Sequence, residues 1–224
     1  MTVTIAGTND AAVIAGVSTA ALIETNAALN ASGTLTIADV DSATTFVAQA
    51  STAGSNNYGT FTLATNGAWT YTTNAAHNEF VAGTNYTDSF TAVAADGTTK
   101  VVTVTIAGTN DAALISGTST ASLAEINVTL NTSGTLTITD VDSAATFVAQ
   151  AGAVGSNNYG TFTLAANGAW TYTMNAAHNE FVAGTNYTDS FSASDSSSSL
   201  NPRFLSISYH RSYHKTRLLE TLRG

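Results

Sequence analysis

Hydrophobic and polar residues alternate with a period of two along several short stretches of the chain. Leu35 and Ile37 alternate with threonine in the run GTLTIAD, and Val102, Val104 and Ile106 alternate with threonine in the run KVVTVTIAG. Such alternation places successive side chains on opposite faces of a β-strand. The pattern therefore predicts half-buried strands and an all-β fold.

A β-hairpin is predicted in the run YGTFTLATNGAWTYT, residues 58–72. Phe61 and Leu63 precede the dipeptide Asn-Gly, and Trp69 and Tyr71 follow it. Asn-Gly between two alternating runs is a strong signal for a tight turn. Seven short antiparallel strands in about 100 residues suit a two-sheet β-sandwich. We expect these strands near residues 11–16, 33–38, 43–50, 58–64, 68–73, 86–94 and 99–106 of the first copy.

The chain contains an internal repeat. A shift of 101 residues aligns residues 2–92 with residues 103–193, and 74 of these 91 positions are identical. Duplication on this scale predicts two domains of one fold in tandem, with a boundary near Gly108–Ala113. An odd number of alternating strands lets the chain enter each unit at one end and leave it at the other. The expected division is residues 1–8 as the last strand and junction of an upstream repeat, 9–108 as the first repeat, 109–195 as a second repeat without its last strand, and 196–224 as a basic tail.

The second copy departs from the first after Ala193. Two interpretations of the tail stay open: a basic anchor or short amphipathic helix at residues 214–222, or, as we favour, sequence foreign to the repeat that arose by frameshift or truncation. The run FLSISY at residues 204–209 alternates well enough to replace the missing strand. Without a replacement, the second repeat is expected to expose a sheet edge and to unfold before the first, or to associate through that edge.

Charge is sparse and unevenly placed. Residues 1–195 hold 14 acidic residues and one basic residue, Lys100, within a chain of net charge −9. A surface of this sign repels nucleic acid and anionic lipid and attracts divalent cations. The sequence has no cysteine, so it has neither disulfides nor thiolate metal sites. No apolar run is long enough to predict a membrane span, and no signal peptide is expected after Met1.

The acidic residues gather in loops that strand parity assigns to the ends of the units. At the entry end of the first repeat, the predicted half-site is Asn9, Asp10, Asp39, Asp41 and Asp96. At the junction between the repeats, the predicted set is Asn110, Asp111, Asp140 and Asp142, joined by Glu24 or Glu79 from the exit end of the first repeat. Clustered carboxylates repel one another unless a cation joins them. Ca²⁺ binds about six to eight oxygens from such groups, so calcium is the expected metal. The alternative, that these side chains cap their own turns, stays open.

Other chemistry is less well supported by the residues. The nucleophile motif GxSxG is absent, and His77 and His178 lack a second histidine at metal-ligand spacing, so no enzyme is expected. A carbohydrate-binding module is the alternative function, with Trp69 and Trp170 as a sugar platform. Alternation with threonine inside a hairpin nevertheless favours core packing of both tryptophans.

The order of the motifs GTLTI-DVDS, YGTF-L-NG-WTYT, TDSF, ADGT and TVTI-GTNDA resembles the VCBS repeats of large bacterial surface and secreted proteins. The resemblance covers residues 1–195. It implies tandem cadherin-like sandwiches of RTX-type adhesins and an extracellular structural role in adhesion or biofilm formation. The expected partners are neighbouring repeats of the same protein, with cell-surface or glycan ligands as further candidates. By analogy it implies calcium ligands in the junction NDA, the DVD pair and the aspartate of ADG. In one departure, Ala11 and Ala112 stand where proline usually follows Asn-Asp in such junctions.

Overall fold

The computed structural model describes residues 1–197 and 203–210, with side chains placed up to residue 197. The chain divides into two compact units, Met1–Asp111 and Ala112–Gly224, which we describe separately. All regular secondary structure in the described residues is β-strand, as the alternation predicted. Within the described part of the chain, no helix is long and apolar enough to cross a membrane.

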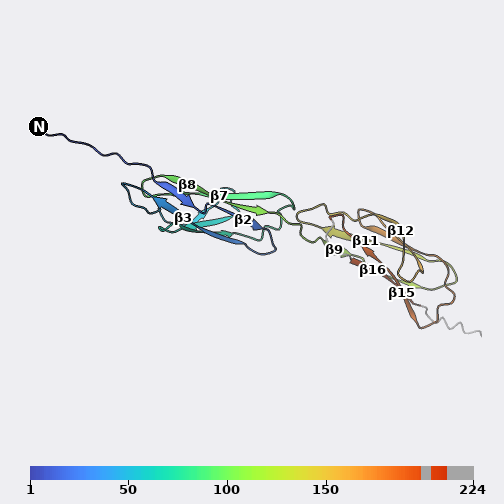
Figure 1. Ribbon diagram of the computed structural model, residues 1–224. Helices are drawn as coiled ribbons and strands as arrows, with labels where there is room; N and C mark the ends of the chain where they lie inside the picture. Colours follow the sequence, from blue (N-terminus) through green and yellow to red (C-terminus); the bar gives the residue numbers. More distant parts are fainter. Residues whose placement is uncertain (198–202, 211–224) are drawn as a thin grey trace, which may run out of the picture. The chain divides into compact units, whose positions relative to one another are not determined.

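The first unit is a sandwich of two sheets (Figure 1). One sheet has five strands in the order β1-β3-β6-β5-β4, and the other has three strands in the order β2-β8-β7. The strands are β1 (Val13–Gly16), β2 (Thr19–Ile23), β3 (Asn30–Ala38), β4 (Gln49–Ala53), β5 (Gly59–Leu63), β6 (Ala68–Thr73), β7 (Asn85–Val93) and β8 (Thr99–Ala107).

The strand expected at residues 11–16 is present as β1, and it is followed by β2, a strand that the sequence analysis did not predict and that lies in the other sheet. β1 pairs antiparallel with β3, whereas β2 pairs parallel with β8. The change follows Gly16, whose φ of +90° is accessible to glycine at little cost. The parallel pairing of β2 with β8 confirms that the chain enters and leaves the unit at opposite ends.

The strand expected at residues 43–50 also differs from the structure. Phe46 forms only an isolated bridge to Ala94, and regular pairing begins at Gln49, the first residue of β4. The backbone of Val47 still bonds to the carbonyl of Val93 beside β7, whereas β4 pairs with β5. This segment therefore crosses from one sheet to the other, so its apolar residues cannot share one strand.

The second unit has the same architecture. Its sheets have the orders β12-β13-β14-β11-β9 and β10-β16-β15. The strands are β9 (Leu114–Gly117), β10 (Thr120–Ala124), β11 (Asn131–Thr139), β12 (Gln150–Val154), β13 (Gly160–Leu164), β14 (Ala169–Met174), β15 (Asn186–Ala193) and β16 (Arg203–His210).

The expectation that the second repeat lacks its last strand was wrong. β16 pairs antiparallel with β15 and parallel with β10, in the place that β8 holds in the first unit. Ile207 lies opposite Asp189, just as Val104 lies opposite Asp88. The run RFLSISYH has the required period of two; its neighbour β15 is an almost unchanged copy of β7, and β10 keeps three of the five residues of β2. The helix considered at residues 214–222 lies outside the described residues.

Residues 1–8, which the sequence analysis assigns to the end of an upstream repeat, form no strand with the first unit. Residues 1–12 have no regular secondary structure, and the N-terminal segment extends away from the first unit (Figure 1). Val3 and Ile5 are exposed. A strand in water needs a neighbouring strand to satisfy its backbone groups, and the first unit offers these residues none.

Each unit has its own aromatic core between the two sheets. Trp69 has a relative exposure of 1 %, and its indole Nε1 donates a hydrogen bond to the carbonyl of Val17 at 2.7 Å. Trp170 repeats this arrangement with Thr118. Both tryptophans are therefore core residues, as the alternation favoured.

Candidate functional site

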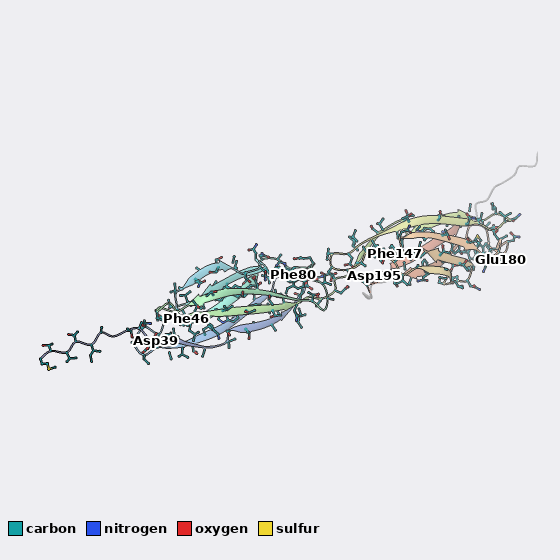
Figure 2. The ribbon with its side chains drawn as sticks, turned by 90° about the horizontal axis from the view of Figure 1, so that it is seen from above. Asp39, Phe46, Phe80, Phe147, Glu180 and Asp195 are labelled. Carbon is teal, nitrogen blue, oxygen red and sulfur yellow. The ribbon has the colours of Figure 1, made fainter. Side chains whose placement is uncertain are left out.

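The entry end of the first unit gathers the predicted half-site. The backbone N–H of Asp10 donates to the carboxylate of Asp41, at 3.1 Å from Oδ2. The N–H of Ala12 donates to Oδ2 of Asp96 at 2.9 Å. Figure 2 shows Asp39 at this same end, where the N-terminal segment leaves the unit. Three loops far apart in sequence thus meet there, as strand parity predicted.

Asp39 organises the DVDS loop with one oxygen only. Its Oδ1 accepts hydrogen bonds from the N–H groups of Asp41 and Ser42, at 2.9 and 2.7 Å. The hydroxyl of Ser42 in turn bonds to the side-chain oxygen of Asn9. Oδ2 of Asp39 is buried and has no hydrogen-bond partner among the described residues. Oδ1 of Asp39 therefore caps the turn, whereas its Oδ2 accepts no hydrogen bond from the described residues.

Asp96 is held as a carboxylate by three donors. The hydroxyl of Thr98 lies 2.6 Å from its Oδ2, and the N–H groups of Ala12 and Thr98 also donate to it. These hydrogen bonds, that of the Thr98 hydroxyl foremost, lower the pKa of Asp96 to about 2. They favour the charged form that a cation would bind.

Glu24 lies at the exit end of the first unit and is buried, with a relative exposure of 1 %. The hydroxyl of Thr109 donates to its Oε2 and, at 3.3 Å, to its backbone carbonyl. Its Oε1 has no hydrogen-bond partner within the part of the chain that the structure describes. The side-chain amide of Asn110, the next residue, bonds to the carbonyl of Asp111 at 2.7 Å. Glu24 therefore lies against the segment that leads out of the unit.

Glu79, the other predicted candidate, is engaged elsewhere. Its Oε1 lies 2.7 Å from Nδ1 of His77, and its side chain is largely exposed. This hydrogen bond from His77 lowers the pKa of Glu79. His77 itself stacks on Phe80, with ring centroids 4.7 Å apart, and its Nε2 lies 2.8 Å from the carbonyl of Tyr58. Of the two glutamates, Glu24 is the one that contacts the junction segment.

The entry loop of the second unit repeats the geometry of Asp39. Oδ1 of Asp140 accepts hydrogen bonds from the N–H groups of Asp142 and Ser143, at 3.2 and 2.9 Å. Oδ2 of Asp140 is again buried without a hydrogen-bond partner among residues 1–197. Burial raises the pKa of Asp140, but the hydrogen bonds from Ser143 and Asp142 outweigh it, and the pKa is lowered. Ser197 occupies the sequence position equivalent to Asp96, so this unit lacks one acid of the set.

The residues at these ends supply oxygen ligands without forming a closed metal cage. Among residues 1–197, no three histidine, aspartate or glutamate side chains converge closely enough to hold a metal ion. Glu24, Asp39 and Asp140 each have one buried carboxylate oxygen that accepts no hydrogen bond among the described residues. Such oxygens fit a hard cation, which binds carboxylate oxygens directly. The joining of ligands from both repeats at one ion stays a prediction.

Sequence reasoning missed a fully buried carboxylate that recurs in both units. Asp88 is fully buried and accepts hydrogen bonds from the N–H groups of Asn56 at 2.8 Å and of Tyr58 and Gly59 at 3.1 Å. The hydroxyl of Tyr71 also donates to it, at 3.2 Å. The signal was present, since alternation in NYTDSF places this aspartate on the inward face of β7.

The buried carboxylate is repeated in the second unit by Asp189, which bonds to the equivalent groups. A Cβ added at Gly54 would lie 2.0 Å from the Asp88 carboxylate, so the approach of this loop requires glycine. Gly155 has the same relation to Asp189. These aspartates therefore fix a loop to the core of each sandwich, a structural task and not a catalytic one.

Aromatic side chains form no exposed platform in the part of the chain whose side chains the structure describes. Within residues 1–197, every Phe, Tyr and Trp is buried or half-buried. The discriminating feature of the carbohydrate-binding alternative, exposed aromatics on a sheet face or loop, is thus missing from this part of the chain.

Comparison with known proteins agrees with this architecture. Residues 9–108 match the family model of the bacterial cadherin-like domain, and residues 110–208 match that of the bacterial Ig domain. The chain therefore carries a bacterial cadherin-like domain and a bacterial Ig domain in tandem, and both are β-sandwiches. A search of curated proteins found no match.

A solved cadherin structure shares the fold at low sequence identity, and a second one gives a weaker match. Extracellular cadherin domains 1–5 of protocadherin gamma B2 align with a TM-score of 0.50 and 13 % identity, over 88 % of this chain and 38 % of that one. Drosophila N-cadherin EC1-4 aligns with a TM-score of 0.49 and 15 % identity, over 89 % and 49 %. The chain thus spans half or less of the length of these structures. Domains of this class are typically non-enzymatic, extracellular modules.

Proposed function

We propose that this chain is a structural module of a large bacterial surface or secreted adhesin of the VCBS type, stiffened by calcium where successive repeats join. The observation that carries this proposal is the set of buried carboxylate oxygens without a hydrogen-bond partner, on Glu24, Asp39 and Asp140. A buried carboxylate oxygen without a partner is costly, and a bound cation removes that cost. Neighbouring repeats of the same protein are the proposed partners.

Both ends of the first unit carry such an oxygen, which is what a repeat needs to bind a neighbour on each side. The entry end offers the half-site around Asp39 and Asp41, and the exit end offers Glu24 followed by Asn110 and Asp111. When bound, calcium supplies positive charge that several carboxylates can share. We propose that Glu24, Asp111, Asp140 and Asp142 bind one ion at the junction.

The proposal is tested by thermal melting and small-angle scattering in millimolar calcium and in chelator. Extracellular calcium modules bind at about 10⁻⁴–10⁻³ M. Binding to the folded state alone adds roughly 1–3 kcal/mol at ten- to hundred-fold excess of calcium over Kd. We expect calcium to raise the melting temperature and to narrow the range of interdomain distances, because the junction is held by a shared ion.

Matched double substitutions locate the ion. Asp140→Asn/Asp142→Asn should abolish the calcium response at the junction, whereas Asp39→Asn/Asp41→Asn should leave that response in place. A wild-type protein that responds to calcium in neither measurement shows that these acids are turn caps only. If calcium still narrows the interdomain distances of Asp140→Asn/Asp142→Asn, the ion binds at another part of the chain.

A further inference from the structure

The run TVTIAG occurs twice, with opposite structural outcomes. In β8, Val104 and Ile106 have relative exposures of 0 and 1 %, because this strand lies between β2 and β7. In residues 2–7, the matching Val3 and Ile5 have relative exposures of 77 and 89 %. The N-terminal segment therefore has the sequence of a central strand but pairs with neither sheet of the first unit.

The second unit contains the matching acceptor. Its β10 and β15 correspond to β2 and β7, and they hold the same kind of central strand between them. β15 reads NYTDSFSA where β7 reads NYTDSFTA, so the edge that contacts the central strand is nearly the same in both units. The occupant differs, however, because β16 reads RFLSISYH and β8 reads TKVVTVTIA.

We propose that residues 1–7 of one copy of this chain serve as the last strand of the second unit of another copy, in place of β16. The register follows from β8: Val3 would lie opposite Asp189 and Ile5 opposite Tyr187, as Val104 and Ile106 lie opposite their partners in β7. Each exchange displaces β16 of the acceptor copy, and residues 1–7 of that copy can in turn displace β16 of a further copy. Repetition therefore joins copies head to tail.

The anchoring of the segment favours a second copy over the chain's own second unit. Asp10 and Ala12 are fixed at the entry end of the first unit by Asp41 and Asp96. With residues 1–7 in an acceptor, only residues 8 and 9 remain as a linker, which spans about 7 Å. The chain leaves the first unit at its opposite end, after the nine residues of β8, which extend for about 30 Å.

β16 and the N-terminal segment thus compete for one place in the sheet. β16 belongs to the same unit, so its effective concentration at this place is high and does not depend on protein concentration. The fraction of units that bind the N-terminal segment of another copy rises with protein concentration. Because exchange requires the sheet to open, equilibrium is best reached by refolding from denaturant at several protein concentrations.

The first test is the molar mass of the full chain, measured by light scattering after refolding. We expect oligomers whose mass grows with concentration, and their loss in Val3→Asp/Ile5→Asp, because a charge in the central strand cannot be buried. The control Val154→Asp/Val182→Asp places the same charges on exposed valines outside the segment and should still assemble. A chain that stays monomeric at every concentration, or oligomers that persist in Val3→Asp/Ile5→Asp, overturns the proposal.

The second test is cross-linking, which the absence of native cysteine makes specific. Thr4 matches Thr105, which lies opposite Thr87, so the partner of Thr4 in the second unit is Thr188. A Thr4→Cys chain refolded with a Thr188→Cys chain should form the mixed disulfide dimer on oxidation. The Thr4→Cys chain with a Ser192→Cys chain is the control, because four residues along β15 displace the thiol by about 13 Å. Equal yields from both mixtures contradict the register and the proposal.

Discussion

The buried acidic residues of these domains differ in how many hydrogen bonds their carboxylate oxygens accept. Asp88 is fully buried and surrounded by backbone and tyrosine donors, whereas Glu24 keeps one buried oxygen without a hydrogen bond among the described residues. The first arrangement stabilises a fold by itself, because hydrogen bonds replace the lost water. The second is stable only at a cost that a cation can remove. Burial alone therefore does not separate structural from ion-binding acids.

Asp88→Asn should destabilise the first unit by about 1–3 kcal/mol, because an amide nitrogen would face N–H donors that now bind carboxylate oxygens and would leave them without an acceptor. This corresponds to a fall of about 4 °C or more in the melting temperature of that unit. Asp189→Asn is the matched substitution and should affect only the second unit. Calorimetry of both variants checks the prediction, and an unshifted first transition in Asp88→Asn contradicts it.

Asp96 should titrate well below an ordinary aspartate. Its folded-state pKa of about 2 lies below the ordinary value of 3.8, so its hydrogen bonds stabilise the fold at pH above that value. This contribution is lost as the pH falls from about 4 through about 2. NMR titration of the side-chain carboxyl measures the midpoint directly. Thr98→Val removes the main donor and should raise the midpoint, whereas a wild-type midpoint near 3.8 rules out the role given to these bonds.

At the scale of elements, one sequence adopts two structures because only one copy has strands on both sides. Residues 103–107 lie within β8, and the identical residues 2–6 have no regular secondary structure. The converse holds for β16, whose sequence is unrelated to β8 and which takes its place between β10 and β15. A run with period-two alternation can thus occupy this central position in the sheet. Whether it forms a strand depends on the presence of a neighbouring strand on each side.

If β16 completes the second sheet, amide hydrogens of β10 and β15 should exchange as slowly as those of β2 and β7. Ile207→Asp should then unfold the second unit, because Ile207 has the register position of the fully buried Val104. Val104→Asp is the matched change in the first unit. Fast exchange confined to β10 and β15 in the unmodified chain would show that β16 pairs only weakly.

At the scale of the whole molecule, the two units are separate compact bodies, each with its own core. Residues 9–111 alone should therefore fold and melt at the temperature of the first unit in the full chain without calcium. Circular dichroism of this fragment against the full chain in chelator provides the measurement. A fragment that is unfolded, or far less stable, shows that the second unit contributes to the first.

The sequence by itself determined the fold class, the duplication, and which residues of most strands face the core. Alternation can be recognised within a single strand, and the duplication can be recognised by comparing the two copies. It placed Leu35, Trp69 and Val104 in the core and grouped Asp10, Asp41 and Asp96 at one end. Tertiary structure decided where the chain changes sheets, because the pairing of Phe46 with Ala94 and of Gln49 with Leu63 joins segments far apart in sequence. It also decided that residues 203–210 complete the second sandwich while residues 2–7 lie exposed. Strands acquire stability only from neighbours, and which neighbours are present is a property of the whole fold.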